Sequence, residues 1–356
     1  MDSVEKLLKN LTEAHGVAGY ESPVRSVVRD FLQPLGELSQ DKLGSVICKQ
    51  VGSGKSPKVM LAGHMDEIGF MVKQITKEGF IKFLPLGGWF DQVLLGHRVI
   101  IKTNKGDVLG VIGAKPPHLL STEERSKVVF RKDMYIDIGA NSEDELKEAG
   151  ILVGDPIVPD SDFQIMANRK SYLSKAFDDR VGVALIVSAL EVLKKQTHPN
   201  TVYGTATVME EVGLRGATTS VDSVQPDVAI ILESDIAGDV PGIKEEESKI
   251  KLGGGPSMVV YDARMIPNHK LCNLISKVAK ELDINLQLSS IEAGATDGGA
   301  IHLYKTGVPT VVLAIPARHI HSHNSIINRD DYDSAVKLVV ELVTRLDAAT
   351  VADFTM

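Results

Sequence analysis

The stretch Lys58-Val-Met-Leu-Ala-Gly-His-Met-Asp-Glu67 opens as an apolar run and closes on a histidine and two carboxylates. Residues 58–62 read as a buried strand, and the polar group follows after a single glycine. Polar side chains at the end of a buried strand are typical of α/β active sites. The stretch therefore predicts an α/β fold with a functional site around His64.

Helices and strands alternate on both sides of this stretch. Residues 24–32 repeat apolar side chains with helical spacing, and residues 45–50 read as a strand. Beyond residue 176 the pattern predicts helices at 181–195, 270–282 and 330–346, and strands at 201–209, 310–315 and 228–232, the last ending at Glu233.

Residues 70–160 have a different character. Short β-rich runs are separated there by Gly-Gly, Asn-Lys-Gly and Pro-Pro, which favours a small barrel or sandwich. Residues 121–132 are the one long polar interlude, and we expect an exposed loop there. The simplest organisation is one α/β domain built from both ends of the chain and interrupted by a β-rich insert.

Composition excludes several classes of protein. The 356 residues carry 47 acidic against 39 basic side chains without a basic run, which argues against a nucleic-acid partner. Two distant cysteines, Cys48 and Cys272, form no CxxC pair and read as reduced thiols. Residues 1–16 read as a helix rather than a signal peptide, and no apolar run reaches the ~20 residues of a membrane span. We therefore expect a cytoplasmic protein without a membrane partner.

Five polar groups at strand ends or turns carry the chemistry. Each group alone has an ordinary structural explanation. A histidine after a strand is often a structural hydrogen-bonding group, adjacent glutamates are often a solvated pair, and one residue of Asp178-Asp179 could be a helix N-cap. Together, buried carboxylates and two imidazoles without a matching set of Lys or Arg are best explained by divalent cations. Mixed nitrogen and oxygen ligands suit Zn²⁺ or Co²⁺, and a spare Glu would complete a two-metal hydrolase. The groups are His64-Met-Asp66, Asp178-Asp179, Glu210-Glu211, Glu233 and His321.

Five motifs resemble the M42 family of metallo-aminopeptidases, which includes glutamyl and deblocking aminopeptidases and the tetrahedral TET peptidases. They occur in the family's order and span nearly the whole chain: Ala62-Gly-His-Met-Asp-Glu-Ile-Gly69, Lys175-Ala-Phe-Asp-Asp-Arg-Val-Gly182, Glu210-Glu-Val-Gly-Leu-Arg-Gly-Ala217, Thr296-Asp-Gly-Gly299 and Ile315-Pro-Ala-Arg-His-Ile-His-Ser322.

The resemblance implies a fold, an assembly and a reaction. The fold is a zinc-peptidase-like α/β domain, residues 1–70 and 165–356, with a mixed central sheet flanked by helices. Residues 71–164 would be an inserted β-barrel dimerisation domain. Dimers would assemble into a hollow tetrahedral dodecamer that admits peptides with a free N-terminus. The reaction would be hydrolysis of the first peptide bond with two divalent metal ions, Zn or Co, per subunit.

The resemblance also implies roles for single residues. His64 and Glu211 would hold separate metals, Asp178 would bridge them, and Glu233 and His321 would complete the two coordination spheres. Glu210 would be the general base. Asp66 would hydrogen-bond His64 and fix its tautomer, and it lies on the same face if the strand continues. Asp179 would be a supporting or capping residue.

The chain departs from the family pattern in three places. Glu233 stands where relatives often have Asp, and His319 where Tyr is common. After the His-Ser pair the chain reads His323-Asn-Ser, so His319 and His323 compete with His321 as ligands. In an extended segment all three would point to one side, and we choose His321 from the motif match. The loop around Asp297 resembles one near the family's substrate and is also strong turn chemistry, and we assign Asp297 no catalytic role.

Three alternative functions remain. A metal-dependent deacylase or carboxypeptidase could use a similar ligand set. A glycanase could use paired carboxylates, but a single Trp and few aromatic residues offer poor stacking for sugars. A non-catalytic scaffold is disfavoured because all five proposed ligand positions are filled.

Overall fold

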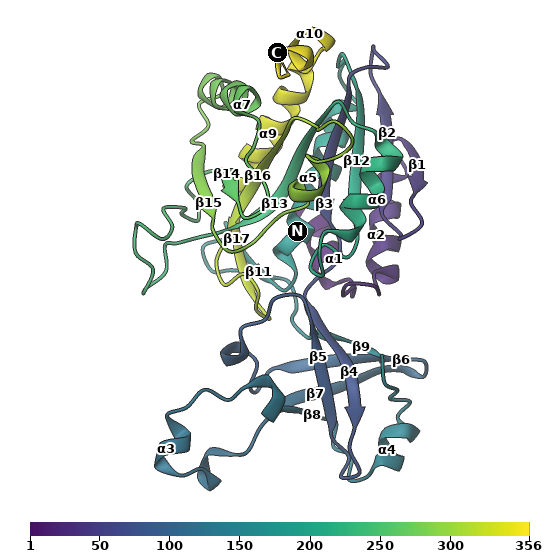
Figure 1. Cartoon of the computed structure of the whole chain (residues 1–356), viewed down its shortest axis with the longest axis vertical. Coiled ribbons are helices and arrows are strands. Elements are labelled where there is room, and N and C mark those ends of the chain that lie inside the picture. Colours follow the sequence, from purple (N-terminus) through teal and green to yellow (C-terminus); the bar gives the residue numbers. More distant parts are fainter. Residues whose placement is uncertain (356) are drawn as a thin grey trace.

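Eight strands form one mixed sheet in the upper part of the molecule (Figure 1), in the computed structural model that describes residues 1–355. The central strands β12, β3, β13 and β16 are parallel, whereas β1, β2 and β14 join through antiparallel pairs. In order, the strands are β1 (Glu37–Gln40), β2 (Val46–Val51), β12 (Thr201–Thr207), β3 (Lys58–His64), β13 (Val228–Ile236), β16 (Thr310–Ala317), β14 (Ser257–Asp262) and β15 (Gln287–Ile291). The predicted mixed sheet is confirmed.

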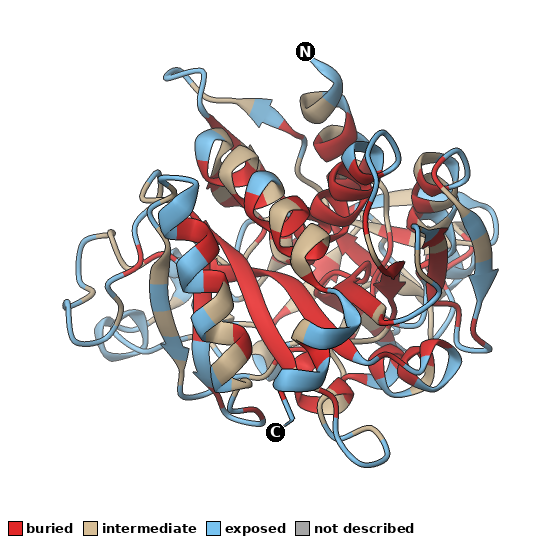
Figure 2. Ribbon diagram, turned by 90° about the horizontal axis from the view of Figure 1, so that it is seen from above, coloured by how far each residue is buried: buried red, intermediate tan, exposed pale blue. Residues whose placement is uncertain are grey.

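Helices cover both faces of this sheet because its central strands are apolar on both sides. Val59 and Leu61 of β3 pack toward one layer of helices, and Met60 and Ala62 pack toward the other. Figure 2 shows the buried strands enclosed between the helices. The first layer contains α1 (Ser3–Glu13), α2 (Ser22–Leu32), α5 (Phe177–Leu193), α7 (His269–Glu281) and α9 (Arg329–Arg345); the second contains α6 (Arg215–Val224) and α8 (Gly298–Ile301). The short helix α10 (Ala348–Asp353) follows α9.

A closed six-stranded barrel forms the lower part of the molecule (Figure 1). Its interior is filled by apolar side chains such as Phe70, Val99 and Ile136. The order around the barrel is β4 (Gly69–Ile75), β5 (Ile81–Leu86), β8 (Tyr135–Asp137), β7 (Gly106–Gly113), β6 (Arg98–Thr103) and β9 (Pro156–Pro159). The β-rich insert is thus a barrel, while the domain boundaries 71–164 stay a prediction.

Short elements complete the structure. The expected loop 121–132 is mostly exposed and contains one helical turn, α3 (Thr122–Arg125). A small sheet contains β10 (Gln164–Ile165), β11 (Ser171–Ser174) and β17 (Ser325–Asn328). Helix α4 (Glu143–Glu148) packs on the barrel core through Leu146. Single 3₁₀ turns lie at Asp91–Val93, Pro117–Leu119 and Arg131–Asp133. Within residues 1–355, no helix combines the length and apolar character needed to cross a lipid bilayer.

Several element ends differ from the sequence prediction by one or more residues, and two of these differences position residues of the site. Strand β12 stops at Thr207, because Met209 adopts a positive φ of 53° and turns the chain into Glu210. Strand β13 continues past Glu233 to Ile236. Asp178 and Asp179 have non-helical backbone angles and a cis peptide between them, so the regular part of α5 follows them, in agreement with the helix predicted from residue 181. Cys48 and Cys272 are free thiols, Cys48 being buried and Cys272 half-buried.

Candidate metal centre

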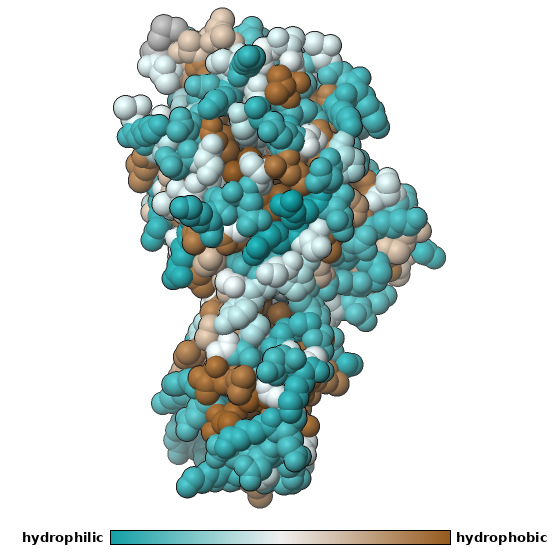
Figure 3. All heavy atoms as spheres, turned by 90° about the vertical axis from the view of Figure 1, so that its right-hand side faces the viewer, coloured by the Kyte–Doolittle hydropathy of each residue, from teal (hydrophilic) through white to brown (hydrophobic). Residues whose placement is uncertain are grey.

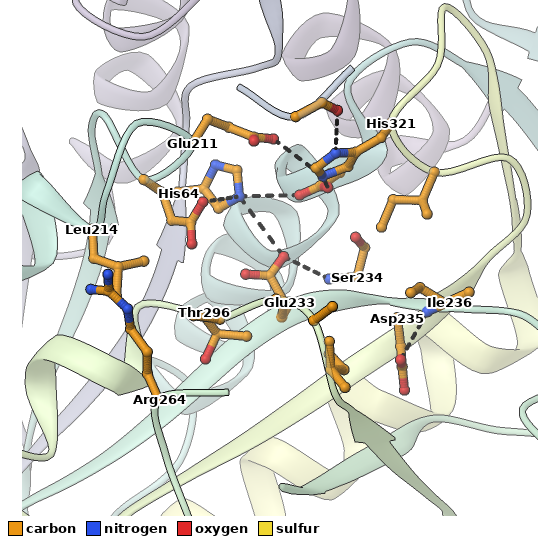
Figure 4. Close-up of a pocket in the computed structure, with 18 of the residues that line it drawn as sticks. His64, Glu211, Leu214, Glu233, Ser234, Asp235, Ile236, Arg264, Thr296 and His321 are labelled. Carbon is orange, nitrogen blue, oxygen red and sulfur yellow. Dashed lines mark hydrogen bonds and ion pairs between the residues drawn. The ribbon is translucent and has the colours of Figure 1, made fainter. Parts of the chain in front are cut away.

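A cavity of about 520 Å³ lies where the carboxyl ends of the parallel strands meet (Figure 4). His64 is the last residue of β3, and Glu210 and Glu211 follow β12 in a turn. Asp178 approaches from the start of α5. Glu233 lies in β13, and His321 lies in the segment after β16. All six of these residues line the cavity: His64, Asp178, Glu210, Glu211, Glu233 and His321.

Asp178 lies between the two imidazoles. Its Oδ1 is 3.1 Å from Nε2 of His64, and its Oδ2 is 3.1 Å from Nε2 of His321. Each carboxylate oxygen therefore faces a different histidine, which is the arrangement that a ligand bridging two cations requires.

The remaining carboxylates divide between the histidines. Glu233 Oε1 lies 3.9 Å and Glu210 Oε2 lies 3.8 Å from Nε2 of His64. On the other side, Glu211 Oε1 lies 3.7 Å from Nε2 of His321. The ring nitrogens and carboxylate oxygens thus converge on two neighbouring points.

Main-chain contacts fix the tautomers of both histidines. Nδ1 of His64 lies 3.0 Å from the carbonyl oxygen of Asp66 and 3.5 Å from its carboxylate. Nδ1 of His321 lies 2.6 Å from the carbonyl oxygen of Gly88, a residue that follows barrel strand β5. When both Nδ1 atoms donate to carbonyls, both Nε2 atoms keep a lone pair directed at the cluster.

The carboxylate of Asp66 has a different partner from the one expected. Its two oxygens accept the main-chain N–H groups of Glu210 (3.0 Å) and Glu211 (3.1 Å). The Nδ1–H of His64 thus donates mainly to the Asp66 carbonyl oxygen, whereas the sequence predicted the Asp66 carboxylate as its acceptor. The carboxylate instead holds the turn that carries both glutamates.

Asp179 links the end of strand β3 to the start of the regular part of α5. Its side chain is fully buried and accepts the main-chain N–H of His64 and that of Gly182, each at 3.0 Å. The bond to Gly182, three residues on, is the N-cap contact of the regular part of α5. Asp179 therefore combines the supporting and capping roles between which the sequence left a choice.

The electrostatics of the cluster require added positive charge. Burial raises the pKa of Glu211 to about 8 and raises the pKa values of Glu210 and Glu233 well above their usual range. Burial alone would lower the pKa of His321. The hydrogen bond to Asp178 and the charge of Glu211 outweigh this effect and raise the pKa to about 10. Oε1 of Glu211 is buried without a hydrogen-bond partner. Carboxylates this close and this buried hold protons unless cations replace them.

The donor set fits divalent metal ions. His64, Asp178 and Glu211 offer ligand atoms within 4.8 Å of one another, and so do His64, Asp179 and Glu233. Because both oxygens of Asp179 already accept main-chain N–H groups, Asp178 is the freer ligand. Imidazole nitrogen with carboxylate oxygen is a ligand set of Zn²⁺ and Co²⁺.

The structure separates the three competing histidines. His319 and His321 both have positive φ, 59° and 57°, so the segment is not extended and the condition under which all three side chains would point to one side is not met. His319 is exposed. His323 is buried, and its ring stacks on His97 with centroids 4.0 Å apart. His321 is the one that contacts Asp178 and Glu211.

Sequence reasoning missed several residues of the site. Glu67 and Lys175, both inside quoted motifs, form a buried ion pair at 2.6 Å beside the cavity, and Arg180 lies 3.5 Å from the same glutamate. Gly88, whose carbonyl oxygen accepts from His321, was also missed. The Gly87-Gly88 pair before Trp89 was the one feature of the sequence that could have drawn attention to it. Asp297 is buried behind the cavity, where it accepts a hydrogen bond from Thr207.

Comparison with known proteins identifies relatives along the whole chain. The family profile described as M42 glutamyl aminopeptidase matches residues 44–338. The glutamyl aminopeptidase of Lactococcus lactis is 34% identical, covering 97% of this chain and 97% of its own length. The lysyl aminopeptidase of Pyrococcus furiosus is also 34% identical, over 96% of this chain and 97% of its own.

Solved structures agree with the sequence relatives. A TET aminopeptidase from a marine sediment Thaumarchaeota archaeon has a TM-score of 0.97 and 50% identity, with 99% of each chain covered. The TET1 peptidase of Pyrococcus horikoshii, which can assemble into a tetrahedron or a large octahedral shell, has a TM-score of 0.87 and 30% identity, covering 97% of this chain and 100% of its own.

Proposed function

The chain belongs to the M42 family of aminopeptidases, and we propose that it hydrolyses the first peptide bond of peptides with two divalent cations and a glutamate base. One observation carries this proposal: the two oxygens of Asp178 face two different imidazoles, each 3.1 Å away. A carboxylate that bridges two cations directs its two oxygens at different ligand sets in this way.

The proposed ligands form two sets that share Asp178. His64 and Glu233 would hold one ion, and His321 and Glu211 would hold the other. The distances from each Nε2 to its carboxylate neighbours, 3.1–3.9 Å, support the two sets. Zn²⁺ or Co²⁺ held there would polarise the scissile carbonyl and lower the pKa of the attacking water.

Glu210 is the proposed general base. It lines the cavity, and its Oε2 lies 3.8 Å from Nε2 of His64, at the edge of the proposed ligand sets. Glu210 would take a proton from the attacking water and pass it to the leaving amine. Asp66 would act as a positioning residue, because its carboxylate holds the main-chain N–H of Glu210.

Self-association through the barrel is the proposed state of the protein. The barrel exposes large apolar side chains, and Figure 3 shows apolar residues gathered on one face of the lower part of the molecule. Exposed examples on the barrel are Leu84, Leu109, Val111, Leu119 and Phe130. With the dodecamer and the tetrahedral shell described for P. horikoshii TET1, they support a barrel-mediated dimer that assembles into a dodecamer. The cytoplasmic location stays a prediction of the sequence.

Metal-restored hydrolysis tests this function. Protein stripped with chelator would be assayed on a panel of aminoacyl-p-nitroanilides, before and after resupply of Zn²⁺ or Co²⁺. We expect release from free-amine substrates only with metal, and none from the N-acetylated versions. Release from N-acylated or C-terminal substrates instead would favour the deacylase or carboxypeptidase alternative. No release from any substrate would contradict the proposal.

A further inference from the structure

The cavity extends beyond the proposed metal ligands to a second wall. Apolar side chains line this wall, namely Leu214, Ile236, Ile291 and Ile320, together with the small residues of Ala293-Gly-Ala295. Because the ligands would hold the substrate's amine end, this wall faces the side chain of the first residue. One cationic side chain, Arg264, lies among the lining residues.

Arg264 is held at its base and free at its tip. Asp262 Oδ1 accepts its main-chain N–H at 2.7 Å, and Asp262 Oδ2 accepts the hydroxyl of Thr296 at 3.0 Å, which ties the turn to the neighbouring loop. A Cβ at Gly299 would lie 2.8 Å from Cβ of Arg264, so the absence of a side chain there makes room for the arginine stem. Figure 4 shows the Arg264 side chain extending toward Leu214.

The guanidinium has no partner of its own. Across residues 1–355, no carboxylate pairs with Arg264 and no acceptor takes a hydrogen bond from its side chain. An arginine directed along a pocket wall without an intramolecular partner is suited to a carboxylate of the ligand, which it can bind through two parallel N–H groups.

The one acid on the same wall is already occupied. Asp235 lines the cavity but is only 2% exposed. Its Oδ1 accepts the main-chain N–H of Ile236 at 2.8 Å, and its Oδ2 accepts the hydroxyl of Ser257 at 2.6 Å. Asp235 therefore has no free oxygen with which to attract a cationic side chain.

The charge balance of the loaded cavity points the same way. Two divalent cations would neutralise the formal charge of four of the lining carboxylates, Asp178, Glu210, Glu211 and Glu233. The fifth, Asp235, is buried with both oxygens hydrogen-bonded, so Arg264 would be the charged group that a substrate side chain can contact. The relatives' names do not decide the preference, because a glutamyl and a lysyl aminopeptidase are equally similar to this chain.

We propose that Arg264 selects substrates whose first residue is acidic, by pairing its guanidinium with the side-chain carboxylate. This inference rests on the proposed aminopeptidase function. The methylenes of a glutamate would contact the apolar wall, while its carboxylate reaches the arginine. Glutamine has nearly the same shape without the charge, so the pair Glu and Gln isolates the contribution of Arg264.

The test compares kcat/KM of the metal-loaded protein for Glu-p-nitroanilide and Gln-p-nitroanilide. We expect wild type to prefer Glu by about 10- to 100-fold, the range of one charge-assisted pair in a partly open site. Arg264→Gln should bring the ratio close to about 1, and Arg264→Lys should keep part of the preference. Arg264→Glu should favour Lys-p-nitroanilide over Glu-p-nitroanilide.

Arg215→Gln is the matched control, because Arg215 is exposed and lies outside the cavity lining. It removes the same charge and should keep the Glu-to-Gln ratio of wild type. Hydrolysis of neutral substrates with no preference for Glu in wild type, or with a preference that survives Arg264→Gln, would overturn the role of Arg264 and leave the aminopeptidase function intact. Absence of hydrolysis with every substrate would overturn both.

Discussion

The two halves of the proposed metal centre are built in different ways. The His64 half, His64 with Glu233 and Glu210, belongs to the sheet: the His64 side chain is 2% exposed, and its main-chain N–H is held by Asp179. The His321 half, His321 with Glu211, depends on a loop. The His321 side chain is 38% exposed, its φ is 57°, and its ring is held by a carbonyl next to the barrel.

This difference separates a fixed ligand set from an adjustable one. Buried strands and their hydrogen-bond ladders open only with the global free energy of unfolding, whereas exposed loops move at much lower cost. The His64 half is therefore preorganised, and the His321 half depends on how the loop and the barrel meet. Five experiments test this contrast, from the largest expected effect to the smallest.

Glu210→Gln should abolish most of the catalytic activity while leaving metal binding by both halves of the centre intact. The amide keeps the shape of the side chain but cannot accept the proton from water, so we expect kcat to fall roughly 10³-fold or more. Metal content, measured by mass spectrometry of the purified protein, should stay near that of wild type. Near-normal turnover would show that another group is the base.

Replacing each histidine should expose the contrast directly. His64→Ala removes a ligand from the preorganised half and should lose most of the bound metal, whereas His321→Ala should keep about one ion per subunit at the intact half. Zinc titration of chelator-stripped variants measures both. Equal loss in the two variants would contradict the proposed difference between the halves.

Asp66→Asn should slow catalysis more than it lowers metal content. Asp66 accepts the main-chain N–H groups of Glu210 and Glu211, and an amide has only one oxygen with which to do so. We expect kcat to fall about 10- to 100-fold, as is usual when groups that orient ligands are changed. An unchanged kcat would mean that the turn is held by its other contacts.

Gly88→Ala should act on the His321 half alone. An added Cβ would lie 3.1 Å from Nδ1 of His321 and would displace the ring from its carbonyl partner. We expect affinity for the more weakly bound ion to fall about 10-fold, with the tighter ion unaffected. A two-step zinc titration distinguishes the ions, and equal weakening of both would contradict the assignment of Gly88 to one half.

Removal of metal should make stability decline with pH. Burial raises the pKa of Glu211 from 4.5 to about 8, so between these values the metal-free native state keeps a proton that the unfolded chain has released. His321, with its pKa raised from 6.5 to about 10, adds the same dependence at higher pH. The free energy of unfolding therefore falls as pH rises through this window.

The measurement is thermal melting at pH 5 and pH 8, with chelator or with zinc. We expect the chelated protein to melt roughly 5 °C lower at pH 8. The zinc-loaded protein should lack this decline, because cations replace the protons at the cluster. The same pH dependence in both forms would argue against metal binding by Glu211 and His321.

The residues proposed for the sheet-borne half could be grouped from the sequence because they lie at or near the carboxyl ends of parallel strands. His64 and Glu210 follow apolar runs of the kind that only buried strands produce, and strand ends converge in any parallel sheet. The loop-borne half was less accessible. Gly88 lies 233 positions before His321, and nothing local in the sequence links a glycine carbonyl of the insert to that ring.

Backbone geometry explains the other differences. The positive φ of Met209 ends β12 two residues earlier than its apolar pattern indicates, and the positive φ of His319 and His321 breaks the expected alternation. Non-glycine residues with positive φ leave no clear trace in composition, because the surrounding structure holds them there. Arg264 lies in none of the recognised motifs. Its position on the cavity wall depends on how the loops pack, which the sequence does not reveal.

The hydrogen bond from His321 to the Gly88 carbonyl also has a thermodynamic meaning. It joins the proposed metal centre to the segment that follows barrel strand β5, so a shift of that segment would change how well His321 could bind an ion. Linkage is reciprocal: an association that displaces the segment and alters metal affinity by some factor must itself be altered by metal through the same factor. In the proposed site, contacts that move this segment of the barrel would therefore be coupled to metal binding in the cavity.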